Sequence, residues 1–251
     1  MSVFCSFILG IVQGLTEFLP ISSSGHLILA QKLFGLEPDL FLNVAMHFGT
    51  LIAVVIFYKK QLWQIAKHPF CKKAKLIYIS TLPTVVLGIV AKLFIPSVLD
   101  GLILPVGFAL TFVLLLTSQY AKKQQHNLLT LPYKTAFWCG VAQGIAVLPG
   151  LSRSGTTICF LKHSGTKGTS ATELSFLMSI PVIFGSIVLM IPDVLSQKVV
   201  IHVMPLVVGM ASSFVFGYIS LGFLHKIAKT SSFEKFAPYM ILPFLLSCLL
   251  V

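Results

Sequence analysis

Long stretches without a charged side chain dominate the sequence. The runs without Asp, Glu, Lys or Arg include residues 40–58, 76–91, 101–121, 174–192, 199–225 and 236–251. About 20 helical residues cross the roughly 30 Å hydrocarbon core of a bilayer. Hydrophobic residues make up 56% of the chain and charged residues 10%, which excludes an ordinary soluble globule. The runs predict an all-α polytopic membrane protein with about six spanning helices, in one integral membrane domain over residues 1–251.

The lysines predict how this bundle is oriented. A net charge of +11 would also suit a nucleic-acid-binding protein, but the lysines gather between apolar runs, which is typical of a membrane protein. The positive-inside rule places the lysine-rich loops in the cytoplasm, with Lys59, Lys60, Lys67, Lys72, Lys73, Lys75, Lys122, Lys123, Lys134, Lys162, Lys167, Lys226, Lys229 and Lys235. The opposite side receives Lys32, Lys92, Lys198, Glu37, Asp39, Asp100 and Asp193. We therefore expect membrane lipid, and no nucleic acid, as a partner.

Two segments of the chain resemble each other at an offset of 130 residues. Residues 10–25 read GIVQGLTEFLPISSSG and residues 140–155 read GVAQGIAVLPGLSRSG. They agree at Gly10/Gly140, Gln13/Gln143, Gly14/Gly144, Ser22/Ser152, Ser24/Ser154 and Gly25/Gly155. Chance agreement in an apolar chain would fall on Leu, Ile and Val, whereas these matches are glycine and polar positions. The pattern predicts an internal duplication.

Each repeated segment is too short to span the membrane as one helix, and each is interrupted by a proline, Pro20 or Pro149. Irregular backbone at membrane depth is tolerated where it is buried in protein or lines a polar cavity. We predict two re-entrant helix–break–helix segments, each followed by three spans, in an inverted-topology repeat whose breaks meet near the midplane. Repeat 1 covers about 1–120, with the re-entrant segment at 4–36 and spans at 40–58, 76–95 and 103–120. Repeat 2 covers about 135–251, with the re-entrant segment at 135–165 and spans at 172–191, 203–224 and 236–251.

The first segment contains a carboxylate in an apolar environment. Gln13 and Glu17 are four residues apart and share one face of a helix that leads to the break. An acidic residue at the middle of a membrane helix costs about 3 kcal/mol, so Glu17 predicts a functional site. A structural ion pair or an interfacial position is the alternative interpretation of this glutamate.

Hydroxyl groups and an imidazole follow the first break. Ser22, Ser23 and Ser24 precede Gly25 and His26. Such hydroxyls often only cap the following half-helix. With Glu17 upstream, however, the pattern also suits catalysis, because a serine nucleophile needs a base and Glu or His can supply one.

The second break carries the only arginine of the chain. Arg153 lies in Pro-Gly-Leu-Ser-Arg-Ser-Gly-Thr-Thr, ahead of a half-helix whose N-terminus favours an anion. The guanidinium group binds phosphate through two parallel hydrogen bonds, which lysine cannot do. We predict a phosphate site, with a snorkelling or carboxylate-pairing arginine as the alternative. Its expected lining is Ser152, Ser154, Gly155, Thr156 and Thr157, with Gln13, Ser22 and Ser24 from the first segment.

Two further titratable residues give weaker indications. Glu173, near the inner end of a span, is equally well explained as an interfacial carboxylate, and His47 favours a packing role over that of a ligand. No HExxH or DxD motif indicates a tightly held metal, though Glu17 and a diphosphate could share Mg²⁺ or Ca²⁺. There is no GxxxxGK[ST] loop for a nucleotide, and we expect no organic cofactor.

At these residues the chain resembles the undecaprenyl-diphosphatase family, the bacterial membrane enzymes linked to bacitracin resistance. The [E/Q]xxxE motif corresponds to Gln13 through Glu17, followed by Phe-Leu-Pro-Ile-Ser-Ser-Ser-Gly-His26. The PGxSRSGxT motif corresponds to Pro149 through Thr157. The hydropathy pattern and the repeat extend this resemblance along nearly the whole chain. Gln13 occupies the first acidic position, which argues against a mechanism that needs two carboxylates there.

The resemblance implies hydrolysis of undecaprenyl diphosphate to the monophosphate carrier of peptidoglycan and other envelope polymers, in the bacterial cytoplasmic membrane with the active site open to the outer face. By the same resemblance, the functional residues of the family correspond to Glu17, Ser23, His26 and Arg153. We expect Arg153 to hold the diphosphate, Ser23 to attack the terminal phosphorus, Glu17 to take the proton or hold a divalent ion, and His26 to assist the leaving group or activate water.

Several alternatives stay open at this stage. Direct attack by a water that Glu17 activates competes with the serine nucleophile. A polyprenyl-phosphate transporter or flippase competes with the phosphatase, because inverted repeats with broken helices are common in transporters. A structural or assembly protein would leave Glu17 and Arg153 unexplained. A homodimer is compatible with the sequence.

Overall fold

The computed structural model describes residues 2–36, 40–94, 103–121, 124–196 and 203–250. These parts of the chain form helices joined by loops, with one isolated β-bridge between His126 and Thr166. The elements of the first half are α1 (Val3–Phe18), α2 (Ser23–Leu33), α3 (Leu40–Phe57), α4 (Lys59–Lys67), α5 (Lys72–Phe94), α6 (Leu104–Thr117) and η2 (Ser118–Tyr120). Those of the second half are α7 (Tyr133–Ile145), α8 (Arg153–His163), α9 (Gly168–Ser196), α10 (Val203–Thr230), η3 (Phe233–Phe236), η4 (Pro238–Met240) and α11 (Ile241–Leu250).

The all-α polytopic fold is confirmed. Four helical stretches are long and apolar enough to cross a bilayer, namely Lys72–Phe94, Gly168–Leu189, Val203–Thr230 and Phe233–Leu250. A fifth span is formed if Leu42–Phe57 is counted with α4, from which it is bent by 74°. The remaining predicted span corresponds to the shorter apolar helix Leu104–Tyr120. Within the described residues, each of the six predicted spans falls on helical segments, and four of them, or five with the bent pair, are long enough to cross a bilayer.

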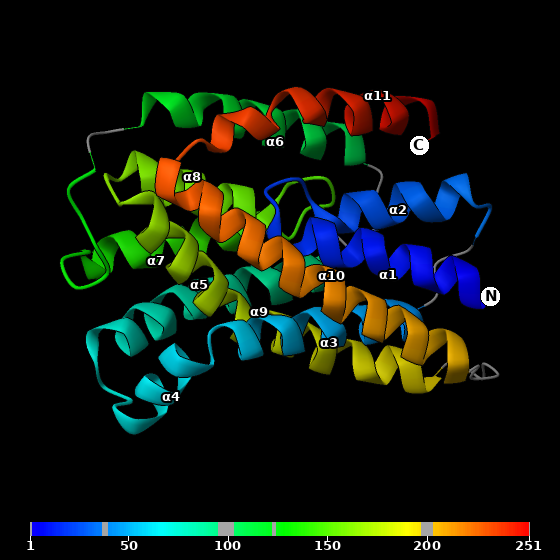
Figure 1. Ribbon diagram of the computed structural model, residues 1–251, viewed down its shortest axis with the longest axis horizontal. Coiled ribbons are helices and arrows are strands. Elements are labelled where there is room, and N and C mark those ends of the chain that lie inside the picture. Colours follow the sequence, from blue (N-terminus) through cyan, green and yellow to red (C-terminus); the bar gives the residue numbers. More distant parts are fainter. Residues whose placement is uncertain (1, 37–39, 95–102, 122–123, 197–202, 251) are drawn as a thin grey trace.

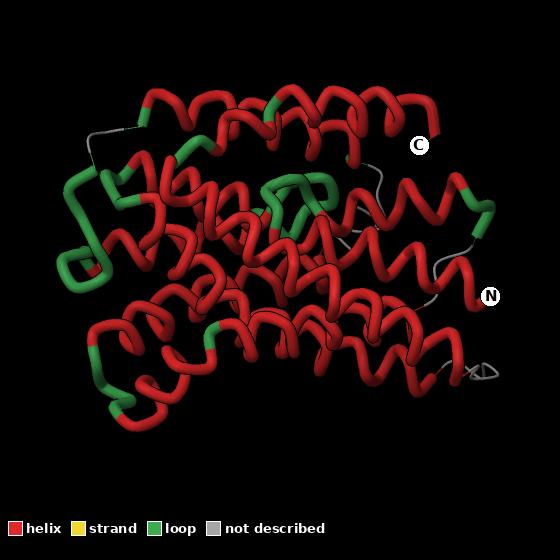
Figure 2. Tube along the Cα trace, viewed as in Figure 1, coloured by secondary structure: helices red, strands yellow, loops and turns green. Residues whose placement is uncertain are grey.

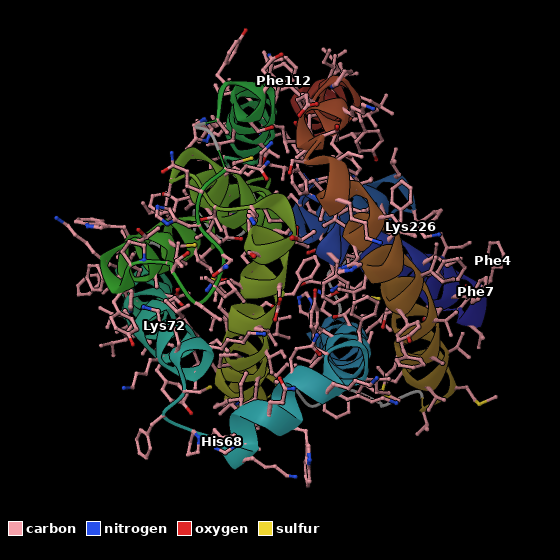
Figure 3. All side chains as sticks on the ribbon, turned by 60° about the vertical axis from the view of Figure 1, so that its left-hand side comes forward. Phe4, Phe7, His68, Lys72, Phe112 and Lys226 are labelled. Atoms are coloured by element: carbon pink, nitrogen blue, oxygen red, sulfur yellow. The ribbon has the colours of Figure 1, made fainter. Side chains whose placement is uncertain are left out.

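The lysine-rich loop after α3 contains a helix that the sequence analysis did not predict. α4 carries lysines at both ends and an exposed Trp63 between them. Its polar and apolar residues segregate to opposite faces, as in a helix that lies along a membrane surface. This loop and the one that follows α6 lie at the same end of the molecule, at the left in Figure 1. In Figure 3, which brings that end forward, His68 and Lys72 mark the turn between α4 and α5.

Several predicted loop charges lie outside the described residues: Lys122, Lys123, Lys198, Glu37, Asp39 and Asp100. The side chain of Asp193 is likewise outside the described part of the chain. The assignment of the lysine-rich loops to the cytoplasm therefore stays a prediction.

The two halves of the chain pack against each other in exchanged pairs. α1 packs on α10 and α7 packs on α5, so each half-helix before a break contacts the second long helix of the other half. Matching elements of the halves also meet, because α3 packs on α9 and α6 packs on α11. A duplicated chain with two-fold-related halves would have this arrangement. The duplication and the opposite membrane orientations of its copies stay predictions.

Small residues permit the closest of these contacts. A Cβ atom at Gly10 would lie 2.5 Å from the carbonyl oxygen of Gly209 in α10, and one at Gly140 would lie 2.0 Å from that of Ser80 in α5. These are equivalent positions of the repeated segments, and each allows the backbones to approach closely. The outer side of α1 instead carries Phe4 and Phe7, which point away from the bundle (Figure 3).

Candidate active site

The first break ends α1 where the sequence predicts it. Leu19 precedes Pro20 and has extended backbone angles, φ −64° and ψ 146°, because a residue before proline is disfavoured in the helical region. Ser22 has a left-handed φ of 73°, which is uncommon for a residue other than glycine and often marks a functional site. Its hydroxyl accepts a hydrogen bond from the Gly25 amide at 3.4 Å and caps α2. Ser23 thereby becomes the first residue of α2.

The second break is built in the same way. Gly150 has a φ of 83°, which glycine adopts without strain, and Ser152 caps α8 by accepting from the Gly155 amide at 3.1 Å. The Thr111 hydroxyl of α6 fixes this loop, because it accepts from the Ser152 amide and donates to the Gly150 carbonyl. Arg153 is the first residue of α8. Ser23 and Arg153 are equivalent positions at the offset of 130 residues.

The two breaks meet inside the bundle. The Ser154 hydroxyl donates to the Leu19 carbonyl at 2.9 Å, and Arg153 Nη2 donates to Glu17 Oε1. Figure 2 shows these loops surrounded by helices, whereas the other loops lie at the ends of the molecule. The structure therefore brings together the two polar segments that the sequence analysis predicts to form one site.

Glu17 is the centre of this site. Only 5% of its side chain is exposed, and Ser23 Oγ donates to Oε2 at 2.6 Å. Gln13 Nε2 donates to the same oxygen at 3.0 Å, as expected for residues four apart on a helix. Oε1 is paired with Arg153. The carboxylate thus contacts a serine hydroxyl on one side and a cation on the other.

His47 belongs to this cluster, although the sequence favoured a packing role. Its Nδ1 accepts from Gln13 Nε2 and lies 3.9 Å from Glu17 Oε2. Because Gln13 Nε2 can only donate, the ring carries its proton on Nε2 when neutral. The sequence held no local signal for this contact, since His47 comes from α3, 34 residues from Gln13.

His26 lies next to the cluster and faces a different partner. Its Nδ1 donates to the Ser22 carbonyl at 2.7 Å, and its Nε2 meets the Tyr239 hydroxyl at 2.9 Å. The two rings also stack, with centroids 5.7 Å apart and planes 8° apart. Tyr239, in η4, is therefore a site residue that the sequence analysis missed, 213 residues away along the chain.

The polar groups predicted to line the phosphate site differ in whether they already have a protein partner. Several have protein partners: Ser22 and Ser152 cap helices, Ser154 bonds to Leu19, and Thr157 bonds to Ser175 at 2.6 Å. Ser24 is exposed, at 3.5 Å from the Ser22 hydroxyl. Among the described residues, Arg153 Nη1, Gln13 Oε1 and Thr156 Oγ1 are buried without a protein partner. Such groups indicate where a bound polar molecule would be held.

Glu173 lies outside this site. Its carboxylate pairs with Lys73 at 2.8 Å, where α9 meets the start of α5. This contact agrees with the interfacial interpretation of Glu173. In the described part of the chain, no group of three His, Cys, Asp or Glu side chains is placed to hold a metal ion. An ion at this site would therefore need oxygen ligands from a substrate besides Glu17.

Fold and site together define a polytopic membrane protein whose interrupted helices bring together a buried carboxylate and a partly buried serine and arginine. Such a site suits an anionic substrate. The sequence model of the bacitracin resistance protein BacA family matches residues 6–245. The chain belongs to this family.

Curated relatives of the chain cover nearly its full length. One, named undecaprenyl-diphosphatase 4, from Bacillus thuringiensis subsp. konkukian, is 40% identical over 238 residues, which cover 94% of this chain and 92% of the relative. The undecaprenyl-diphosphatase of Carboxydothermus hydrogenoformans is 36% identical over 245 residues, 96% and 94% of the two chains. That of Methanococcus vannielii is 38% identical over 244 residues, 94% and 96% of the two chains.

Proposed function

We propose that this protein hydrolyses undecaprenyl diphosphate to undecaprenyl phosphate and inorganic phosphate. The observation that carries the proposal is the hydrogen bond between Ser23 Oγ and Glu17 Oε2 beside Arg153, in a chain whose relatives are named for this reaction. The reaction recycles a lipid carrier for envelope polymers, which accounts for the bacitracin resistance in the family name. We place it in the cytoplasmic membrane, with the site open to the outer face.

In the proposed mechanism, the diphosphate binds to the guanidinium group of Arg153. Its Nη1 is available, and substrate oxygens compete with Glu17 for Nη2. The backbone N–H groups at the start of α8 add to the attraction for a phosphate. Phosphoryl transfer needs mainly positioning and charge stabilisation, which this arrangement provides.

Ser23 Oγ then attacks the terminal phosphorus, and its proton passes to Glu17 Oε2 at 2.6 Å. The bond from phosphorus to the bridging oxygen breaks, and undecaprenyl phosphate leaves with that proton, so Glu17 is ionised again. Water then attacks the phosphoserine and gives one proton to Glu17. As inorganic phosphate departs, Ser23 Oγ takes this proton from Glu17. His26 lies three residues after Ser23 on the same face of α2, and we assign it to the leaving group or to this water. Tyr239 orients its ring.

A divalent ion is a further part of the proposal. Glu17 would hold Mg²⁺ or Ca²⁺ jointly with the diphosphate, since its carboxylate is the only one in the described cluster. The ion would neutralise phosphate charge. A lipid-transport function receives no specific support from any contact in the site.

The function is tested by phosphate release from undecaprenyl diphosphate by purified protein in detergent, with and without a chelator. Protein in detergent micelles does not separate two compartments, so transport alone would give no phosphate release. We expect release by the wild type and a marked decrease with chelator that Mg²⁺ or Ca²⁺ restores. Absence of phosphate release would contradict the proposed hydrolysis. Full activity in the presence of chelator would contradict only the proposed role of a divalent ion.

The serine step gives a separate prediction. Ser23→Ala removes the nucleophile but leaves Arg153 and Glu17 in place, so we expect phosphate release to fall by at least about 10²-fold. Acid quenching of the wild type during turnover should trap phosphoserine at Ser23, detectable by mass spectrometry. Ser232→Ala, which alters a hydroxyl in the loop after α10 and outside the site, is the matched control. Full activity in Ser23→Ala beside an inactive Glu17→Gln would favour direct attack by water.

A further inference from the structure

A cavity of about 650 Å³ lies between α5, α7 and α9. Its walls are mostly apolar and include Val85, Ile89, Val147, Val188 and Leu189. These five side chains are also exposed on the surface of the bundle. In a membrane protein that surface faces lipid, so the cavity opens toward the hydrocarbon core. Its volume lies within the range of about 300–1,000 Å³ that is typical of ligand sites.

The cavity includes two polar groups of the second repeated segment. Arg153, which is bonded to Glu17, forms part of its lining. Gln143 also lines it, is 2% exposed, and donates through Nε2 to Thr84 Oγ1 at 3.0 Å. Its Oε1 is buried and has no protein partner among the described residues. Arg153 therefore belongs both to the lining of the cavity and to the cluster around Glu17.

These features fit a ligand with an anionic head and a long apolar chain. Arg153 would hold the head, and the apolar walls would bury the part of the chain next to it. We infer that this cavity binds the first isoprene units of the substrate, those next to the diphosphate, and that the rest of the chain continues into the bilayer. The inference rests on the proposed function and assigns a specificity site to it.

Two glycines form part of the cavity lining. Gly88 in α5 and Gly185 in α9 both line it, and a Cβ added to either would meet no atom within 4 Å. A larger side chain can therefore be introduced there without a clash with the backbone. Gly222 in α10 is equally unobstructed and half-buried, but is not part of this lining. The chain thus supplies both a cavity-filling substitution and its matched control.

The test compares Gly185→Leu with Gly222→Leu on two substrates, undecaprenyl diphosphate and methyl diphosphate, which has no prenyl unit. We expect Gly185→Leu to raise the KM for undecaprenyl diphosphate about 10-fold and to leave kcat and the KM for methyl diphosphate within twofold. Gly222→Leu should change neither. An unchanged ratio of the two KM values in Gly185→Leu, or an equal change in Gly222→Leu, would overturn the inference.

A binding measurement separates this inference from the proposed activity. A prenyl diphosphate with a benzophenone on its second isoprene unit is cross-linked by light to Glu17→Gln protein, which binds without turnover. We expect labelled peptides from α5 and α9, and their loss in Gly185→Leu. Labels confined to α1, α2 or α10, or complete displacement by phosphatidylglycerol vesicles, would overturn the cavity assignment. Labelling of α5 and α9 with no phosphate release by the wild type would instead reject the proposed hydrolysis alone.

Discussion

We expect Glu17→Gln to lower the rate of phosphate release by about 10²- to 10⁴-fold, the usual contribution of a general base. The amide keeps the shape of the carboxylate and can still accept from Ser23, but it cannot take the proton of the hydroxyl. The kcat should fall, and the KM should stay near that of the wild type, because Arg153 remains to hold the diphosphate. Steady-state phosphate release in detergent measures both values.

Glu173→Gln is the matched control for this change. It removes a helical carboxylate that pairs with Lys73 and lies outside the site. We expect it to retain the activity of the wild type. Glu17→Gln with more than about half of the wild-type kcat would show that Glu17 does not take the proton, and the mechanism would then lose its base. Equal losses in Glu17→Gln and Glu173→Gln would assign the effect to folding.

We expect Arg153→Lys to lower kcat/KM by about 10²- to 10³-fold, in the range found when one donor to a developing charge is removed. Lysine keeps the positive charge, but it offers a single point of contact in place of two parallel N–H groups. The loss should appear in kcat and in KM together, because the same group binds the diphosphate and stabilises the charge that develops on it. Steady-state kinetics with undecaprenyl diphosphate resolves the two parameters.

Two further variants separate catalysis from stability at this position. Arg153→Ala leaves Glu17 buried without its partner, which typically costs about 3–5 kcal/mol of folding free energy. The double variant Glu17→Gln/Arg153→Ala removes both charges, so its melting temperature should recover while activity stays absent. Lys73→Arg replaces the lysine of the ion pair with Glu173 by arginine, and it should change neither the melting temperature nor the rate of phosphate release. Wild-type kinetics in Arg153→Lys would show that the bidentate contact is not used.

Gln13 shows how the structure refines a prediction made from a motif. The sequence indicates that a second carboxylate is absent at this position, and the structure shows what the amide does there. Its Nε2 donates to Glu17 and to His47 at once, which uses both of its N–H bonds. A glutamate would place two carboxylates side by side, and one of them would have to bind a proton. Gln13 therefore supports an ionised Glu17 in this chain.

The location of the spans and breaks could be predicted from local properties of the chain. The apolar runs correspond to α3, α5, α6, α9, α10 and α11, because burial in lipid depends on the residues of each segment alone. Pro20 and Pro149 end the half-helices for an equally local reason. The helical nature of the lysine-rich segment 59–67 was missed, since a short amphipathic helix at a surface has no long apolar run.

Glu17, Ser23 and Arg153 could likewise be predicted from the sequence, because a charge or a hydroxyl cluster at membrane depth is conspicuous in an apolar chain. Tyr239 and His47 could not. Each reaches the site from a separate helical element, and tyrosine or histidine in such an element also suits simple packing. The cavity beside Arg153 was equally beyond prediction, since its walls come from α5, α7 and α9.

The sequence by itself determined the class of the protein, its breaks and the three residues at the centre of the site, because hydropathy, proline and isolated charge act within a few residues. The tertiary structure decided which groups these residues meet. Helix packing pairs Glu17 with Arg153, 136 residues away, and gives His26 the Tyr239 hydroxyl. Such contacts depend on the close approach of separate helices, which the local sequence does not encode.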